Sequence, residues 1–254
     1  MLAHHQLWPP RQLKGKAGVM AYFQRVGSIQ FDPINVVGRN PDLVLQSRIA
    51  NYNPQLLEAL LYEDRQLVDF WDKVMCIYPV ADWPAFARHR ARMGAYSKQR
   101  SPEAQDYTEA VITEIKERGP LSSIDFDHDK KVDWAWGPTR AARAALESLY
   151  NAGELIVHHK IGTRRVYGLA ENHIPTQLLH APDPNQSQED YQRWHVLRRM
   201  GSLGLTSPMS GEHWLMILDV KSKERQAILR HLVETEQAIV DGIWRNNCFR
   251  KIEW

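Results

Sequence analysis

The sequence has very little cysteine. Its two cysteines, Cys76 and Cys248, lie far apart, and neither has a second cysteine or a histidine at metal-ligand spacing. This pattern argues against a disulfide framework and against a zinc ribbon. Thiols that are not paired in disulfides are typical of cytosolic proteins. We therefore predict a cytoplasmic protein that has no metal site and no cofactor.

Long hydrophobic runs are also absent. No apolar stretch reaches the length of about 20 residues that a membrane-spanning helix needs, and no signal-peptide core follows Met1. The nearest approach to metal ligands is the pair His4-His5 and the pair His158-His159. Because neighbouring residues of a strand point to opposite sides, we expect neither pair to hold an ion.

Neither sign of charge dominates, since 32 Lys and Arg stand against 30 Asp and Glu. Basic residues nevertheless gather before residue 50 and again in residues 86–100, whereas residues 58–72 are acidic. Local basic zones on a near-neutral chain suit a polyanion bound on one face, although ordinary solvated helix faces explain any single cluster as well. A chain of 254 residues has room for two or three small domains.

What the sequence does contain is an amide and a carboxylate two residues apart, in Gln30-Phe31-Asp32. In an extended segment Gln30 and Asp32 point to the same side, Phe31 faces the core and Pro33 ends the segment. The amide can orient a water, and the carboxylate can accept its proton or stabilise positive charge on a sugar. The pair is a candidate hydrolytic site, although Gln-x-Asp alone is weak and a turn or a helix cap is its ordinary explanation.

Hydrophobic spacing and caps predict the elements around this segment. The first domain should contain a helix over residues 16–26, a helix that begins at Asn53-Pro54 and a pair of strands at 67–71 and 75–78. A further helix begins near Asp82, and residues 97–102 resemble a linker.

The middle of the chain predicts a winged helix, which is three helices followed by a two-stranded hairpin. The expected elements are a helix over 103–118, a short helix capped by Ser122-Ser123, a helix from Pro138-Thr139 to Gly153, and strands at 155–158 and 165–169. Arg140 and Arg143 then lie on the third helix and Arg164 and Arg165 on the wing, where they either contact DNA or only keep the surface soluble.

The run from Ile29 to Leu45, followed by Ser47-Arg48 and Tyr52, resembles the bacterial AlkZ/YcaQ family of DNA glycosylases. The similarity continues to Pro175 and more loosely to about Gly242. It implies tandem winged helices and a catalytic Gln-x-Asp pair. It also implies hydrolysis of the N-glycosidic bond of N7-alkylated guanine, including interstrand crosslinks, during DNA repair.

The expected fold class is mainly α with small β hairpins (α+β), arranged as tandem winged-helix domains. We place a first winged-helix-like domain at 1–100, a second at 103–176 and a partial third at 186–254. Helical patterns at 191–203, 210–218 and 224–239 open this third domain. Its hairpin is expected after Val240 but is not recognisable there, so we predict a truncated third domain and a shortened N-terminal helix.

The resemblance also assigns roles to individual residues. Gln30 and Asp32 are expected to be catalytic, and Asn35, Trp71 and Lys73 to support them. Lys73 departs from the family, which often has Trp-x-His where this chain has Trp71-Asp72-Lys73. The expected DNA-binding residues are Arg39, Arg48, Arg140, Arg143, Arg164 and Arg165.

Several alternatives stay open at this point. Asn35 can instead cap a turn, Arg39 can pair with Asp42, and Trp71 can belong to the core, whereas Trp134 and Trp136 can stack on bases. The expected partner is double-stranded DNA with an alkylated guanine, bound by a monomer. The rival interpretations are a non-catalytic winged-helix regulator and an inactive glycosylase fragment.

Overall fold

The computed structural model describes all 254 residues except Pro33, 128–129, 135–136, Ser210, 242–247 and 253–254. The chain divides into two compact units. The first unit is discontinuous and contains Met1–Leu60, Trp71–Pro79 and Pro184–Trp254. The second contains Leu61–Phe70 and Val80–Asp183. The three domains predicted from the sequence stay a prediction.

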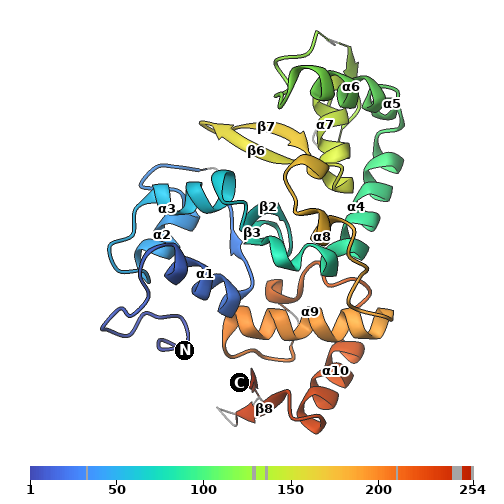
Figure 1. The fold of residues 1–254 in the computed structure, drawn as a ribbon. Helices are drawn as coiled ribbons and strands as arrows, with labels where there is room; N and C mark the ends of the chain where they lie inside the picture. The colour runs from blue at the N-terminus through green and yellow to red at the C-terminus, as the bar shows by residue number, and fades with distance from the viewer. Residues whose placement is uncertain (33, 128–129, 135–136, 210, 242–247, 253–254) are drawn as a thin grey trace. The chain divides into compact units, whose positions relative to one another are not determined.

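The first unit is built from helices and two short antiparallel pairings (Figure 1). Its elements are α1 (Gly15–Val26), β1 (Ile29–Gln30), α2 (Asn40–Gln46), α3 (Pro54–Glu58), β3 (Met75–Pro79), α9 (Gln188–Leu203), α10 (Ser222–Glu234), β8 (Ala238–Asp241) and β9 (Cys248–Lys251). The predicted helices at 16–26 and after Asn53 are confirmed, and the Asn53 side chain caps α3 by accepting from the Leu56 N–H.

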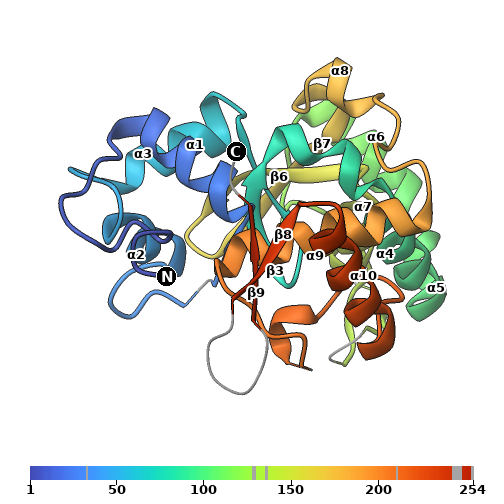
Figure 2. The same cartoon turned by 90° about the horizontal axis from the view of Figure 1, so that it is seen from below.

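Two groups of buried side chains form the interior of this unit. Val19, Phe23 and Val26 lie on one face of α1 and are almost completely buried. Figure 2 shows the β8–β9 hairpin beside α9 and α10, and a second cluster joins these elements. That cluster contains Val196, Met200, Trp214, Ile217, Leu229, Leu232, Ala238 and Phe249.

The second unit is also helical, with two hairpins (Figure 1). Its elements are α4 (Ala87–Arg100), α5 (Pro102–Gln105), α6 (Thr108–Arg118), β4 (Lys131–Val132), β5 (Thr139–Arg140), α7 (Ala141–Ala152), β6 (Leu155–Ile161), β7 (Arg164–Leu169) and α8 (Thr176–Leu179). β2 (Leu67–Trp71) carries the chain from this unit back to the first.

Helix α7 is the centre of the second unit. It packs against α4, α5 and α6, and its Tyr150 ring lies 4.8 Å from Phe70. The helix ends as predicted at Gly153, whose φ of 80° is a left-handed conformation that glycine adopts without strain. The wing follows as the antiparallel pair β6–β7, which turns at Gly162 and is longer than predicted.

Two predictions for the second unit are wrong. Residues 97–102 are not a linker, because α4 continues to Arg100 and the buried Ser97 accepts a hydrogen bond from Asn151 on α7. The helix expected after Ser122 is a turn instead. The Asp125 carboxylate accepts from the Ser122 N–H and hydroxyl, which satisfies donors that a helix would have used.

The third predicted domain also differs from expectation. Of the described residues of the 210–218 helix, only Glu212–Trp214 form a helical turn, and the expected helix over 224–239 ends at Glu234. The hairpin that the sequence analysis considered missing is present as β8 and β9. Hydrophobic spacing did not reveal these strands, because Ala238 and Phe249 belong to the same apolar cluster as residues of α9 and α10.

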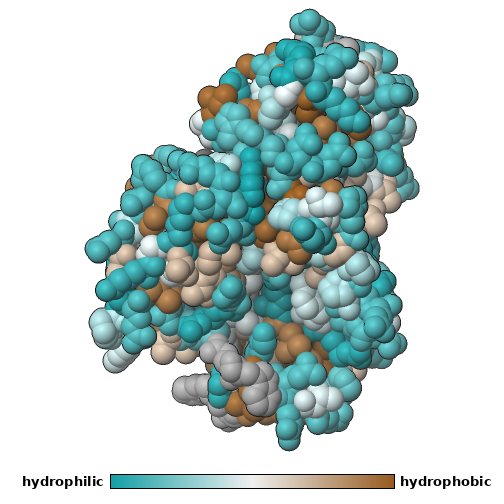
Figure 3. Space-filling view, in the orientation of Figure 1, coloured by the Kyte–Doolittle hydropathy of each residue, from teal (hydrophilic) through white to brown (hydrophobic). Residues whose placement is uncertain are grey.

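The fold is therefore mixed α+β, with several helices and small antiparallel hairpins, as predicted. The face drawn in Figure 3 is mostly hydrophilic, with hydrophobic residues in separate small patches. Among the described residues, no helix combines the length and the apolar character that crossing a membrane requires.

Candidate functional site

The Gln-x-Asp segment lies at the end of β1, which pairs with β3 so that Gln30 faces Cys76 in register. Ile29 and Phe31 are 5% and 8% exposed, whereas Gln30 is exposed and Asp32 half-buried. This alternation is the one predicted for an extended segment, and it keeps the amide and the carboxylate out of the core. Pro33, predicted to end the segment, lies outside the described residues.

Backbone contacts fix both sides of the segment. The Phe31 N–H donates to the Met75 carbonyl at 2.9 Å, and the Asn40 side chain donates to the Gln30 carbonyl at 3.0 Å. The Asp32 carboxylate accepts from the Ile34 N–H at 2.9 Å, which is an Asx-turn. Asp32 therefore makes the turn that the sequence analysis considered its ordinary role.

The buried carboxylate of Asp72 holds the residues that come directly before this segment. Asp72 is fully buried, and its Oδ2 accepts from the Ser28 hydroxyl at 2.8 Å and from Arg198 Nε at 3.1 Å. Its Oδ1 accepts from Arg199 Nη2 at 2.9 Å and lies 3.1 Å from His195 Nε2. Two arginines and a hydroxyl thus give this buried charge the partners it needs.

The charges around Asp72 set its protonation state and that of His195. Burial by itself would raise the pKa of Asp72, but Arg199, His195 and Arg198 hold it well below its ordinary value. Burial lowers the pKa of His195 despite its bond to Asp72, so the imidazole is neutral at pH 7. The centre is an ionised carboxylate between two guanidinium groups.

This network reaches the backbone just before the candidate pair. Arg198 Nη2 donates to the Gly27 carbonyl at 2.8 Å, and a Cβ at Gly27 would lie 3.1 Å from the Arg198 side chain. Gly27 is therefore held by α9 directly, and Ser28 is held through Asp72. The sequence analysis did not identify Asp72 or its partners. The residue pair Asp72 and Lys73 was noted only as a departure from the family pattern.

The expected supporting residues lie near the pair in sequence but differ in burial. Asn35 is exposed, and Trp71 and Lys73 are half-buried. Trp71 ends β2, and Lys73 lies in the turn between β2 and β3. The half-burial of Trp71 matches neither a fully buried core residue nor an open stacking surface.

Both arginines of the first unit that were expected to contact DNA already have partners within the chain. Arg39 pairs with Asp42 at 2.6 Å and with Glu58 at 3.1 Å, which is the alternative considered for it. Arg48 donates to the Val44 carbonyl at 2.8 Å and to the Ser47 hydroxyl. Contacts of these arginines with phosphates stay a prediction.

Three of the other expected DNA-binding arginines lie around one depression of the second unit. Its volume is about 280 Å³, and it is lined by Ser123, Arg143, Leu146, Glu147, Thr163, Arg164, Arg165 and Tyr167. Arg143 is 60% exposed and pairs with Glu147 at 3.1 Å. Arg165 lies over the Tyr150 ring at 5.4 Å. The depression thus joins α7 to the wing with a net positive lining.

Arg140 does not lie on α7 as predicted. It belongs to β5, opposite Lys131, and its guanidinium donates to the Phe126 carbonyl at 2.7 Å. The β4–β5 pairing keeps residues 139–140 extended and delays the helix to Ala141. Trp134 packs against the cluster of Ala104, Val132, Ala141 and Ala144, which differs from the base-stacking role considered for it. Trp136 lies outside the described residues.

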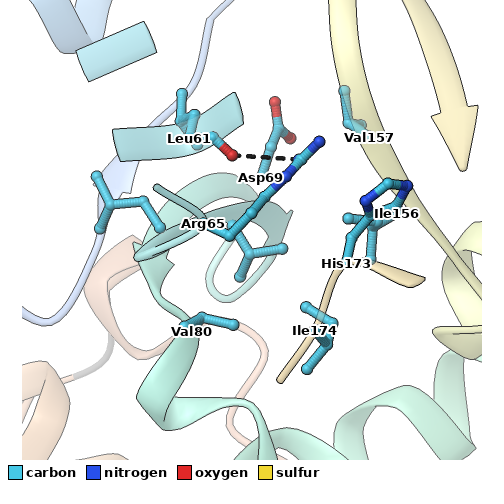
Figure 4. Close-up of a pocket in the computed structure, with 10 residues that line it drawn as sticks. Leu61, Arg65, Asp69, Val80, Ile156, Val157, His173 and Ile174 are labelled. Atoms are coloured by element: carbon cyan, nitrogen blue, oxygen red, sulfur yellow. Dashed lines mark hydrogen bonds between the residues drawn. The ribbon is translucent and has the colours of Figure 1, made fainter. Parts of the chain in front are cut away.

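A small cavity in the second unit does not qualify as a nucleobase pocket (Figure 4). Its volume is about 10 Å³, which is room for a single water. Arg65 donates to the Leu61 carbonyl at 3.2 Å beside it, and burial together with the Arg65 charge lowers the pKa of His173 to about 4. Asp69, also in the lining, pairs with Lys160. These contacts make the cavity part of the interior.

The two histidine pairs behave differently from the expectation. His158 and His159 do not point apart, because the β6–β7 register shifts between Val157 and His159 and brings their Nδ1 atoms to 2.8 Å. His4 and His5 bond the carbonyls of Gly201 and Leu203 instead of an ion. Within the part of the chain that the structure describes, no group of three or more His, Cys, Asp or Glu is arranged to hold a metal.

Comparison with known proteins agrees with this arrangement. A family model described as DNA glycosylase AlkZ-like matches residues 23–248, so the chain belongs to the AlkZ-like family of DNA glycosylases. The solved structure of Streptomyces sahachiroi DNA glycosylase AlkZ is similar in fold, with a TM-score of 0.65 over 97% of this chain and 67% of that one. The two sequences are 12% identical. The resemblance found in the sequence is confirmed at the level of the family.

Proposed function

We propose that this chain is a DNA glycosylase that releases N7-alkylated guanine from double-stranded DNA, including guanines joined in interstrand crosslinks. The observation that carries the proposal is the Gln30 and Asp32 pair, displayed outside the core on either side of buried Phe31. An exposed amide and a half-buried carboxylate are the groups that hydrolysis of a glycosidic bond needs.

The leaving base does not have to be protonated before the glycosidic bond breaks. Alkylation at N7 places a positive charge on the guanine, so the electron pair of the C1′–N9 bond leaves with the base and neutralises that charge. The sugar becomes oxocarbenium-like, and the Asp32 carboxylate stabilises it. A water oriented by Gln30 attacks C1′, and Asp32 accepts its proton. The products are the alkylated base and an abasic site.

The Asp72 network supports this role by fixing the approach to the pair. Proper alignment of water and carboxylate requires a rigid backbone, and Arg198 holds the Gly27 carbonyl while Asp72 holds the Ser28 hydroxyl. Lys73 follows Asp72 directly and places a positively charged side chain where the family often has histidine. We propose that it contacts the DNA backbone beside the lesion, with Asn35 and Trp71 shaping the same surface.

We assign DNA binding to winged-helix surfaces, which we propose are present in tandem. In the second unit a helix is followed by the β6–β7 wing, and in the first unit α10 is followed by the β8–β9 hairpin. Arg143, Arg164 and Arg165 supply positive charge for phosphates at the depression between α7 and its wing. The protein is proposed to act as a monomer.

The test is incubation with a duplex that contains one N7-methylguanine, followed by heat or alkali to cleave at abasic sites. We expect a single cut at the lesion and none in the matched unmodified duplex. Free N7-methylguanine should appear in equal amount. Binding of the duplex without any release of base would contradict the proposal and favour a non-catalytic DNA-binding protein or an inactive glycosylase.

A further inference from the structure

An exposed apolar tip follows the Gln30 and Asp32 pair. Ile34 is 66% exposed, and Val36 and Val37 are 86% and 84% exposed. Isolated apolar residues on a surface are ordinary, but three within four positions of one loop are a local excess.

The base of this loop is anchored while its tip is displayed. On one side the Asp32 carboxylate accepts from the Ile34 N–H at 2.9 Å, and on the other Asn40 donates to the Gln30 carbonyl at 3.0 Å. Gly38 has a φ of 146°, and a Cβ there would lie 2.9 Å from Leu43 Cδ2, so the loop returns closely against α2. These contacts leave Val36 and Val37 projecting from a fixed base.

We propose that Val36 and Val37 form a wedge that enters the DNA base stack beside the lesion. This inference rests on the proposed glycosylase function and adds a contact that the chemistry of Gln30 and Asp32 does not itself supply. An enzyme that must reach C1′ and surround a base has to unstack it, and inserted apolar side chains keep the neighbouring bases apart.

The surroundings of the loop fit DNA as the occupant. Between Asp32 and Asp42 the chain has no acidic residue, so a polyanion can approach this stretch. The faces of bases are apolar and accept the side chains of valine, whereas Asn35 beside them can hydrogen-bond to a base edge. The tip also lies within five residues of Asp32. The valines can therefore enter the DNA base stack beside the deoxyribose that Asp32 contacts.

The first measurement is binding, which needs no catalysis. The probe is a duplex with 2-aminopurine next to an N7-methyl-2′-fluorodeoxyguanosine, whose fluorine keeps the glycosidic bond intact. Unstacking raises 2-aminopurine fluorescence, and we expect the wild-type protein to cause this rise. The double variant Val36→Ser, Val37→Ser should bind without the rise. Met209→Ser, which changes a 59% exposed methionine of the first unit, is the matched control and should behave as wild type.

The second measurement is excision. The double variant should lose about tenfold in rate on the N7-methylguanine duplex, equivalent to about 1.4 kcal/mol. It should retain the wild-type rate when the same lesion lies in an unpaired bubble, where unstacking is already complete. Because both valines are highly exposed, its melting temperature should stay unchanged.

The outcomes separate the two proposals. No fluorescence rise with the wild type, an unchanged rise with the double variant, or equal losses on duplex and bubble would each overturn the wedge. If the wild type excises nothing but its fluorescence rise depends on Val36 and Val37, the wedge stands and the glycosylase proposal fails.

Discussion

Asp32 and Asp72 are carboxylates of the same unit with opposite surroundings. Asp32 is half-buried and bonded to one backbone N–H, whereas Asp72 is fully buried between Arg198 and Arg199. A catalytic carboxylate has to meet a cation that develops on the substrate, so a group already neutralised by two guanidinium ions is poorly suited to the task. We therefore assign chemistry to Asp32 and support to Asp72.

The first prediction concerns Asp32→Asn. We expect excision of N7-methylguanine to fall by about 10²–10³, by analogy with the loss of one donor that stabilises a transition-state charge. DNA affinity should stay constant or rise slightly, because an anion near the phosphates is removed. Gln30→Ala should cost less, since an unguided water still attacks a weakened bond. Single-turnover rates and binding isotherms measure the two effects.

The matched control for this prediction is Asp106→Asn, which changes an exposed carboxylate in the second unit. It should leave both excision and affinity at the wild-type level. Wild-type excision by Asp32→Asn would remove Asp32 from the mechanism.

The second prediction concerns Asp72→Asn and stability. Removing this charge leaves Arg198 and Arg199 without their shared anion, so we expect a loss of about 3–5 kcal/mol at pH 7. The pKa of Asp72 is lowered in the folded state, so its contribution is complete above the unfolded value of about 3.9 and declines as the pH falls below that. The gap between wild type and variant should narrow from pH 7 to pH 3, as measured by urea unfolding.

Asp106→Asn again serves as the control and should show little difference at either pH. A gap for Asp72→Asn that is equally large at pH 3 and pH 7 would mean that the carboxylate charge is not what stabilises the unit.

Residue-scale features were predictable from the sequence only when they were local. The alternation around Phe31 follows from neighbouring positions, and the structure confirms it. The two arginines and the histidine that bond Asp72 lie 123 to 127 residues away, and no spacing rule connects them to it.

At the scale of elements, α7 and the β6–β7 wing form a basic surface whose arginines are not equivalent. Arg165 is held by Tyr150 and by the Tyr167 hydroxyl, and Arg140 by the Phe126 carbonyl. Arg143 has only an exposed pairing with Glu147 among the bonds described for it, and such pairs contribute little. Arg143 and Arg164 are therefore the better choices for exchange onto phosphates.

The third prediction concerns the double variant Arg143→Ala, Arg164→Ala. Its affinity for duplex DNA should fall for all sequences, and each lost phosphate contact should reduce the log–log salt slope by roughly 0.9. Titrations at several salt concentrations measure the slope. Lys116→Ala, at an exposed lysine of α6, is the control. An unchanged slope in the double variant would place the polyanion elsewhere.

Elements were predictable where hydrophobic spacing and end signals agreed. α1, the end of α7 at Gly153 and both strands of the wing follow from such signals. The helix predicted after Ser122 does not form, because a serine and an aspartate three residues apart bond each other in a turn as readily as they cap a helix. The β8–β9 hairpin was not predicted, because strands of four residues that follow shortly after a helix are too short to show a period of their own.

At the scale of the whole molecule, the predicted helices and hairpins correctly indicated an α+β protein, and the resemblance correctly indicated its family. The order of compact units was not predictable. Sequence reasoning divides a chain into consecutive segments, whereas the first unit combines residues from both ends of the chain. Only contacts between distant residues, such as those of α9 with α1, reveal that combination.

The discontinuous first unit also has a consequence during synthesis. Arg198 follows Asp72 by 126 residues, so a ribosome that adds about 5–20 residues per second exposes Asp72 for about 6–25 s before its counter-charge emerges. Throughout that interval the nascent Gln30–Asp32 segment lacks the support of α9. The proposed catalytic pair therefore gains this support only after Arg198 has been added to the chain.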